Sequence, residues 1–279
     1  MGYDIMICDI YSLSYIQDYK DERLKICDLI IITTPPSLHF EIAHYFLQLG
    51  KRVVIEKPPV INKDQINILK ELDVENLIYC AYHTAFNPLF GKIDKHLDIS
   101  SIQSIEIINK EYIYNYHKQD GWITNPEISG GGCLIDNGIN SFSVILNLVN
   151  SINFVSGHLE SRHIQVEDLV EISLSAKNNN GSEVSIKYIS DWFYKENEER
   201  KYIIRSKNDI LELNIAQNKI FLNGSEVKND FGDINSVQEV EEYRALVADI
   251  FRYFETHESY IKNDKFEPLE LVLSCYNLI

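Results

Sequence analysis

The sequence carries little positive charge and no long apolar segment. Its 26 lysine and arginine residues are outnumbered by 42 aspartate and glutamate residues, which gives a formal net charge of −16. A field of this sign repels phosphate backbones and anionic lipid headgroups. No stretch reaches the roughly 18 uncharged apolar residues of a membrane-spanning helix, and the start shows no basic segment followed by an apolar one. We therefore expect a cytoplasmic protein that binds neither nucleic acid nor membranes.

Paired cysteines are missing as well. The five cysteines are odd in number and scattered, and no two of them have C-x-x-C spacing. The lack of this spacing excludes a thioredoxin-like motif and a zinc site built on such pairs, and it indicates a reducing compartment. We expect buried free thiols and no metal. The residues concerned are Cys8, Cys27, Cys80, Cys133 and Cys275.

Glycine is absent between Gly2 and Gly50. Dinucleotide-binding folds open with a strand, a G-x-G-x-x-G turn and a helix whose N-terminus holds the pyrophosphate. Nothing in this part of the chain matches that turn. Asp9 instead follows the first predicted strand, in the place of the ribose-binding acid that comes about 20 residues after the glycines. We therefore expect that one strand–helix unit, about 25–30 residues long, is missing.

The first third of the chain alternates short apolar runs with amphipathic helical runs, which is the pattern of βαβ units around a parallel sheet. Ser37 is expected to cap a helix that ends at Gly50, and Asn62 to cap a second helix. A missing central strand would leave the first two predicted strands either to pair directly or to keep unpaired backbone groups. The predicted strands are residues 4–8, 29–33, 52–55 and 77–81, and the predicted helices are residues 38–49 and 62–72.

Beyond about residue 100 the pattern changes to strands separated by polar turns, with two long helical stretches. The fold class is α/β: an incomplete Rossmann-like N-terminal domain over residues 1–98, then an α+β domain over residues 99–279 for substrate binding and oligomerisation. The second domain is expected to contain a large open antiparallel sheet. Its predicted strands are residues 102–114, 170–176, 183–190, 201–205, 210–215 and 219–222, and its predicted helices are residues 134–149 and 237–257.

Polar residues follow the strands of the predicted N-terminal sheet. Thr34 and Pro35 follow the second strand, and Glu56 and Lys57 follow the third. Ligands of open α/β sheets bind outside the carboxyl ends of the strands, so these residues and Asp9 are candidates for binding a dinucleotide. Taken singly, an aspartate after a strand also fits a turn or a cap, and a Glu-Lys pair also fits a solvated salt bridge.

Two sequence runs carry a family resemblance. The first is Thr34-Pro35-Pro36 with the downstream run GKRVVIEKPP (50–59), and the second is GGGCLIDNGIN (130–140). Together they resemble the glucose–fructose oxidoreductase/inositol dehydrogenase (Gfo/Idh/MocA) family, in which the second run leads into a catalytic helix. The resemblance implies an oxidoreductase that uses NAD or NADP. Asn140 stands where the family's usual pattern has histidine.

Further motifs are similar to the aldose 1-dehydrogenase branch of this family, which includes the D-galactose and L-arabinose 1-dehydrogenases. The likeness covers essentially the whole chain. It implies that a cyclic aldose is oxidised at C1 to a lactone, and that a homodimer or tetramer forms through the open sheet. The motifs are Asp-x-Gly-Ile-Asn at 136–140, YHTAFN at 82–87, Glu242-Tyr243 and residues 267–269.

Asp136 and Asn140 are four residues apart on a predicted helix, so both project from one face. The three glycines before this helix would let a ligand approach the backbone. Asp136 is the candidate base for the anomeric hydroxyl proton, Asn140 would orient the hydroxyl, and Lys57 would stabilise the developing oxyanion. An acid at a helix start is also favoured by the helix dipole alone.

Four further residues are candidates for substrate binding. Glu111 and His117 look like the remaining sugar ligands of the branch, and Trp122 is placed to stack on a sugar face. His83 belongs to the same resemblance. His117 fits a solvated loop imidazole equally well, and His83 fits a core position.

Three explanations compete for the missing phosphate turn. The true protein starts upstream and is a complete dehydrogenase, or the chain is a catalytically inactive sugar sensor or interaction protein of the same fold. In the third explanation, the cofactor is held by a partner subunit or in another mode. Asp9 favours NAD over NADP, because a carboxylate repels a 2′-phosphate.

Overall fold

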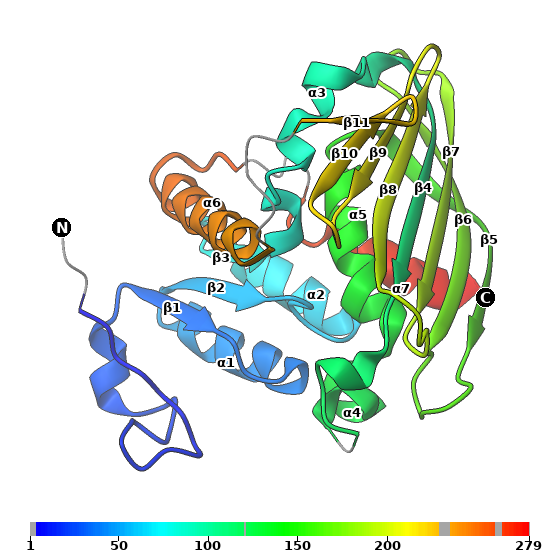
Figure 1. Ribbon diagram of the computed structural model, residues 1–279. Helices are drawn as coiled ribbons and strands as arrows, with labels where there is room; N and C mark the ends of the chain where they lie inside the picture. Colours follow the sequence, from blue (N-terminus) through cyan, green and yellow to red (C-terminus); the bar gives the residue numbers. More distant parts are fainter. Residues whose placement is uncertain (1–3, 120, 229–234, 260–263, 279) are drawn as a thin grey trace.

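The computed structural model describes residues 4–119, 121–228, 235–259 and 264–278. Within these ranges the chain forms two β-sheets, a small one near the N-terminus and a large one built by the later residues (Figure 1). The three strands of the small sheet pair in parallel, in chain order. They are β1 (Leu29–Ile32), β2 (Arg52–Glu56) and β3 (Ile78–Ala81). None of the helices in the described ranges is long and apolar enough to cross a membrane.

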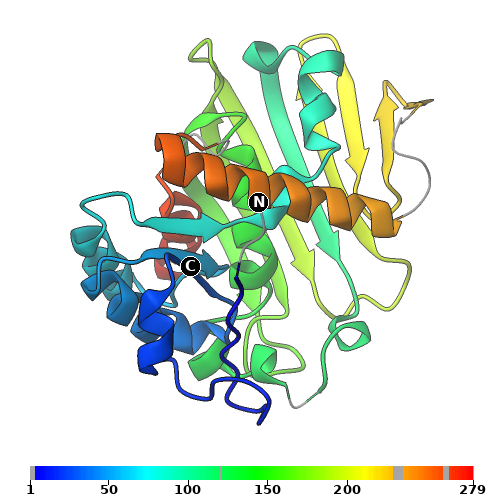
Figure 2. The same cartoon turned by 90° about the vertical axis from the view of Figure 1, so that its left-hand side faces the viewer.

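Helices cover both faces of the small sheet. The crossover helix α1 (Pro36–Gln48) packs under it, and α6 (Asn235–Thr256) lies over the opposite face (Figures 1 and 2). The residues of the central strand are accordingly buried, with Val53, Val54 and Ile55 at most 2% exposed. Continuous apolar strands of this kind are typical of parallel sheets covered on both sides.

The two crossover helices are α1 (Pro36–Gln48) and α2 (Lys63–Leu72). Asn62 caps α2 as predicted, since its Oδ1 accepts the backbone N–H of Gln65 at 3.0 Å. The cap predicted for α1 was wrong: Ser37 lies inside the first turn, and no side chain caps this helix. The helix begins with a proline, which has no N–H that needs a partner.

The strand predicted over residues 4–8 was wrong. This stretch is exposed and forms one isolated bridge, between Cys8 and Ile16. In the described chain β1 pairs only with β2, so the first two predicted strands do not pair directly. The backbone N–H and C=O groups of a strand need hydrogen-bond partners. On the side of β1 that faces away from β2, no strand of the described chain supplies them.

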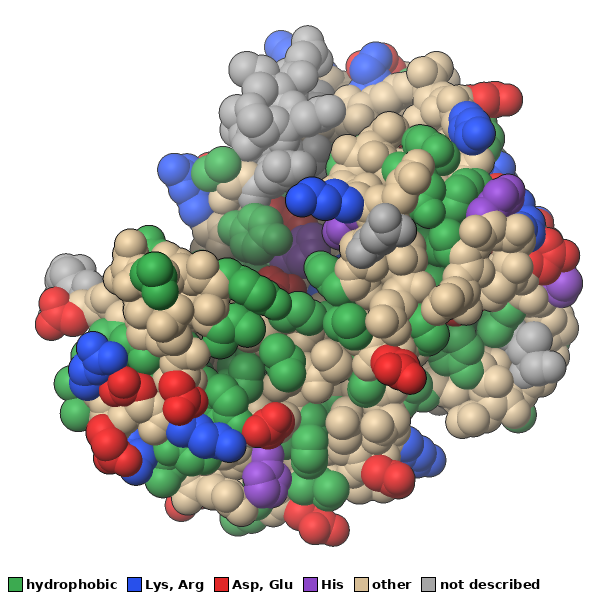
Figure 3. Space-filling model, turned by 90° about the horizontal axis from the view of Figure 1, so that it is seen from below, with side chains coloured by type: hydrophobic (Ala, Val, Ile, Leu, Met, Phe, Trp, Pro, Cys, Tyr) green, Lys and Arg blue, Asp and Glu red, His purple; other side chains and the backbone are tan. Residues whose placement is uncertain are grey.

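Large apolar side chains are exposed to solvent beside β1, the edge strand of the small sheet. Ile5, Leu13 and Ile31 are 82%, 92% and 61% exposed. In Figure 3, which shows the molecule from below, hydrophobic side chains gather on the left and in the middle of the face. Cys8 is also exposed, against the prediction of buried thiols, because it lies on the same unpaired segment. Three of the other cysteines are buried, and Cys27 is partly buried.

The large sheet has eight strands in the order β11-β10-β9-β8-β4-β7-β6-β5. Neighbouring strands are antiparallel except β4 and β7, which run parallel. The predicted antiparallel sheet is therefore mixed, because the chain leaves β4 through helices and re-enters at the far edge. The strands are β4 (Ile102–Lys110), β5 (Asn150–Glu160), β6 (Leu169–Lys177), β7 (Glu183–Asp191), β8 (Glu199–Ser206), β9 (Ile210–Asn214), β10 (Lys219–Leu222) and β11 (Ser225–Val227).

Strand β5 was not predicted, since polar residues and a glycine interrupt its apolar alternation. The helix predicted over residues 134–149 is a π-helical segment, Leu134–Gly138, followed by α5 (Ile139–Ile145). These segments pack on one face of the large sheet, where Tyr188 and Tyr202 are 0% and 2% exposed. The remaining α-helices of the described chain are α3 (Ile93–His96), α4 (Pro126–Ser129) and α7 (Glu267–Leu278).

Candidate functional site

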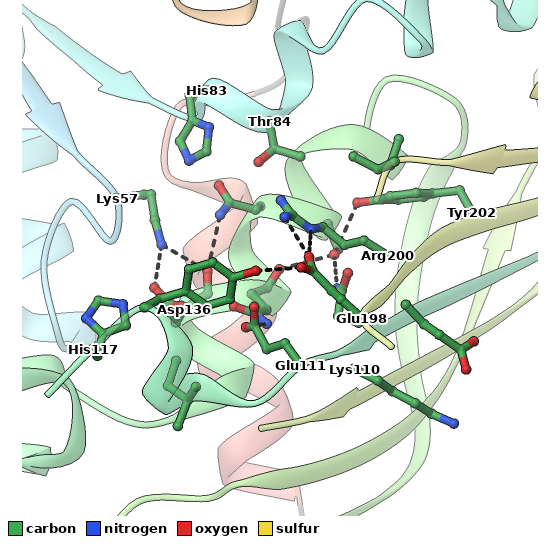
Figure 4. Close-up of a pocket in the computed structure, with 18 residues that line it drawn as sticks. Lys57, His83, Thr84, Lys110, Glu111, His117, Asp136, Glu198, Arg200 and Tyr202 are labelled. Carbon is green, nitrogen blue, oxygen red and sulfur yellow. Dashed lines mark hydrogen bonds and ion pairs between the residues drawn. The ribbon is translucent and has the colours of Figure 1, made fainter. Parts of the chain in front are cut away.

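A cavity of about 270 Å³ lies between the carboxyl ends of β2 and β3 and the large sheet (Figure 4). This volume is slightly below that of most ligand cavities, which measure roughly 300–1,000 Å³. Segments far apart in the sequence contribute to its wall. The charged and polar residues considered below are Lys57, His83, Glu111, Tyr116, His117, Asp136, Asn140, Glu198, Arg200 and Tyr202.

An ion pair joins the two sides of the cavity. Lys57 follows β2, and its Nζ forms a short contact with Oδ1 of Asp136 in the π-helical segment. The same Nζ donates to the backbone oxygen of Asp136 at 3.3 Å. Both side chains are about four-fifths buried, at 17% and 21% exposed. The fold therefore places the predicted lysine and aspartate in direct contact.

Asn140 lies one turn beyond Asp136 and lines the same cavity. Its Nδ2 donates to the backbone oxygen of Asp136 at 3.3 Å. Its Oδ1 is buried and has no hydrogen-bond partner in the described chain. An unpaired buried acceptor is costly, and a ligand hydroxyl that donates to it would remove that cost.

Glu111 follows β4 and accepts a hydrogen bond from Nδ2 of Asn137 at 2.8 Å. Burial raises the pKa of Glu111 above its ordinary value. The bond from Asn137 opposes this rise, and the charge of Asp136 adds to it. The side chain is therefore a carboxyl that keeps its proton to higher pH in the folded state than in the unfolded chain.

This raised pKa predicts a pH-dependent effect of Glu111→Gln. In the wild type the stability linked to Glu111 is present below the ordinary carboxyl pKa and is lost as pH rises through the raised pKa. The amide cannot ionise but can still accept from Asn137. We expect the free energy of unfolding of the variant, relative to wild type, to increase between about pH 5 and pH 8. Urea titrations at both values measure it, with Glu75→Gln as an exposed control. A difference that does not change with pH would contradict the role of burial.

His117 lines the cavity, and burial lowers its pKa. The charge of Asp136 opposes this shift and that of Lys57 adds to it. Trp122 meets the His117 ring edge-on, with 6.0 Å between the centroids, and is 39% exposed. It is not among the residues that line the cavity, so its contact with the site runs through His117.

His83 follows β3 and points into the cavity from the side of the small sheet (Figure 4). Its Nδ1 lies 2.5 Å from Oε1 of Glu242, whose Oε2 accepts from Nδ2 of Asn87 at 3.0 Å. The His83 ring stacks on Tyr243, with 5.4 Å between the centroids. The Glu242-Tyr243 pair of the sequence motif therefore lies on α6 and orients His83.

The far wall of the cavity contains residues that the sequence reasoning missed. The Tyr116 hydroxyl donates to Oε2 of Glu198 at 2.5 Å, and this bond raises the pKa of Tyr116 to about 12. Arg200 donates from Nε and Nη2 to Oε1 of Glu198, at 3.0 and 2.7 Å. The Tyr202 hydroxyl donates to Ser141 at 3.2 Å. The available signal was the alternation of residues 198, 200 and 202, which places every second side chain of a strand on one face.

The glycines before the π-helical segment do not leave room for a ligand, so that prediction was wrong. A Cβ on Gly131 would lie 2.4 Å from the hydroxyl of Tyr276, and one on Gly132 would lie 2.0 Å from the backbone oxygen of Glu167. Gly130 has a φ of +81°. Other atoms of the protein therefore fill the space that a side chain at these glycine positions would need.

The residues predicted to bind the cofactor are only partly brought together. His39 joins the ends of β1 and β2, with ring nitrogens 2.7 Å from the Thr34 oxygen and 2.8 Å from the Pro58 oxygen. Thr34 Oγ1 is buried without a partner in the described residues. Glu56 accepts the N–H of Lys57 at 3.1 Å, beside the cavity. Pro35 occupies the N-cap position of α1.

Asp9 lies outside the cavity lining and is exposed. Its carboxylate accepts the backbone N–H of Tyr11 at 2.9 Å, which is the local turn contact left open as an alternative. Parallel strands with helical crossovers, whose carboxyl ends face a polar cavity under a second sheet, define a Rossmann-like α/β architecture.

Comparison with known proteins agrees with this class. Residues 7–81 match the model of the Gfo/Idh/MocA oxidoreductase family, described as an NAD-binding Rossmann fold. The sequence match to this family therefore lies in the N-terminal part of the chain. It is 29% identical to galactose 1-dehydrogenase of Pseudomonas fluorescens over 124 residues, which cover 44% of this chain and 38% of that protein. The aligned segments span 36–40% of the length of the curated relatives.

Solved structures share the fold over most of the chain. D-galactose-1-dehydrogenase protein from Rhizobium etli aligns with a TM-score of 0.71 and 19% identity, covering 90% of this chain and 76% of that one. Levoglucosan dehydrogenase in complex with NADH and L-sorbose aligns with a TM-score of 0.74 and 16% identity, covering 93% and 79%. At these identities the likeness shows the fold.

Proposed function

We propose that the protein is an NAD(P)-dependent sugar oxidoreductase that oxidises a cyclic aldose of the galactose or arabinose type at C1 to a lactone. The observation that carries the proposal is the Lys57–Asp136 pair beside the unpartnered Oδ1 of Asn140, in a cavity at the carboxyl ends of a parallel sheet. The family of the matched domain and the similarity to a galactose 1-dehydrogenase support it.

The described residues fit one end of a dinucleotide. Thr34, with its unpartnered Oγ1, and Pro35 would contact it at the end of β1, and Glu56 and Lys57 would do so at the end of β2. The glycine-free stretch from Asp4 to Leu49 contains no phosphate-binding turn. A bound NAD(P)+ would supply the acceptor for the hydride that leaves C1 of the sugar.

The residues of this chain perform the remaining steps. Asp136 accepts the proton of the anomeric hydroxyl, and Oδ1 of Asn140 accepts a hydrogen bond from a neighbouring hydroxyl of the sugar. The positive charge of Lys57 stabilises the oxygen on which negative charge develops. Glu111 and His117 bind further hydroxyl groups of the sugar. His83, held in place by Glu242, forms the wall of the cavity on the side of the small sheet. The lactone is released with the proton passed on to solvent.

Calorimetric titration of the 279-residue chain with NAD+, NADP+, D-galactose and L-arabinose tests this proposal. We expect a sugar and a dinucleotide to bind, and absorbance of the reduced nicotinamide to increase when both are present. Binding of sugar without dinucleotide would instead support the inactive sugar sensor. Binding of neither ligand would contradict both functions.

A further inference from the structure

A buried carboxylate lies at the start of the helical segment that carries Asp136. Glu167 precedes β6 and is 8% exposed. One of its oxygens, Oε1, accepts three hydrogen bonds: from the N–H of Gly132 at 2.8 Å, from the N–H of Leu134 at 3.1 Å and from the hydroxyl of Tyr276 at 2.5 Å. Its backbone oxygen accepts from the N–H of Cys133 at 2.9 Å.

No lysine or arginine forms an ion pair with this carboxylate in the described part of the chain. Burial raises the pKa of Glu167, while the bond from Tyr276 and the backbone bonds oppose the rise. The pKa of Tyr276 is also raised, first by burial and then by the charge of Glu167. A buried carboxylate without a cation depends on its hydrogen bonds, so these three donors hold it in one position.

The glycines fit closely around this group. Gly131 and Gly132 have no room for a Cβ because Tyr276 and Glu167 occupy the space. The backbone continues directly to the catalytic residues, since the N–H of Asp136 donates to the Gly132 oxygen at 3.0 Å. Any shift of Gly132 is therefore passed to Asp136 through one hydrogen bond.

We propose that Glu167 and Tyr276 are positioning residues that fix Asp136 and Asn140 relative to Lys57. The inference rests on the proposed function, because it assigns these residues to the sugar site. Tyr276 belongs to α7 and lies 140 positions after Asp136, yet its hydroxyl bonds to the carboxylate at the start of the segment that carries Asp136. The C-terminal helix is thus part of the framework of the site.

Tyr276→Phe tests the proposal because it removes one donor and keeps the ring. We expect affinity for D-galactose to weaken about tenfold by calorimetry, since a hydrogen bond to a charged group is lost. Amide hydrogen exchange in the peptide covering residues 130–138 should accelerate by a similar factor. Glu167→Gln should change both measurements less than Tyr276→Phe does, since its amide oxygen still accepts hydrogen bonds from these donors, although without the negative charge.

The matched control is Tyr79→Phe. Tyr79 is buried, and its hydroxyl donates to Oδ2 of Asp249 at 2.8 Å, away from the cavity lining. This control should lower stability without changing galactose affinity or the exchange of residues 130–138. Unchanged exchange in Tyr276→Phe would overturn the proposal, and so would faster exchange with unchanged affinity. If the wild type binds no sugar, the proposed function fails, and the exchange comparison still decides whether the pair holds this segment.

Discussion

Replacing Asp136 by asparagine is expected to lower kcat for aldose oxidation by about a hundredfold or more, because the amide cannot accept the hydroxyl proton. The amide has nearly the same size and can still accept one hydrogen bond, so sugar affinity should be largely retained. Lys57 loses its ionic partner in this variant but keeps the Asp136 backbone oxygen as an acceptor. Steady-state kinetics with NAD+ and D-galactose, together with calorimetry of the sugar alone, separate the two effects.

Asp94→Asn is the control for this experiment, since Asp94 is exposed on α3 and outside the cavity lining. It should leave kcat and affinity unchanged. Unimpaired turnover in Asp136→Asn would remove Asp136 from the role of base. Loss of sugar binding together with turnover would show instead that the charge of Asp136 serves mainly to bind substrate.

The second large effect is expected on stability. Gly132→Ala should lower the free energy of unfolding by about 3 kcal/mol, the upper part of the range for overpacked positions. The added Cβ would lie 2.0 Å from the backbone oxygen of Glu167, and a backbone atom cannot move aside as a flexible side chain can. Urea unfolding monitored by tryptophan fluorescence measures the change.

Gly91→Ala is the matched control. A Cβ at Gly91 meets nothing within 4 Å, and its φ is not in the left-handed region. We expect its free energy of unfolding to stay within about 0.5 kcal/mol of wild type. Equal effects of the two substitutions would show that close packing at Gly132 does not matter for stability.

The candidate site could be predicted from the sequence only where motifs carry it. Lys57 and Asp136 are 79 positions apart, and their spacing gives no sign of contact. They were placed in one site because each belongs to a run that resembles the same family. Glu198 and Arg200 belong to no such run, so only the pairing of β8 with β4 brings them to the cavity wall.

The unpaired start of the chain shows the limit of local patterns. Residues 4–8 have the apolar composition of a buried strand, and this composition predicted one. A strand also needs a hydrogen-bonding neighbour, and β1 has one only on the side of β2 in the described chain. Asp9 consequently takes part in a local turn, and its predicted role in binding a ribose stays a prediction.

The sequence by itself determined the βαβ order of the small sheet, the cap at Asn62 and the pair of Asp136 and Asn140 on one helical face. These features depend on periodicities and spacings of a few residues. The tertiary structure alone decided that the large sheet is mixed, that Glu242 orients His83, and that Glu167 and Tyr276 fill the space beside the glycines. Such contacts join residues far apart in the chain, so they depend on how the elements pack together.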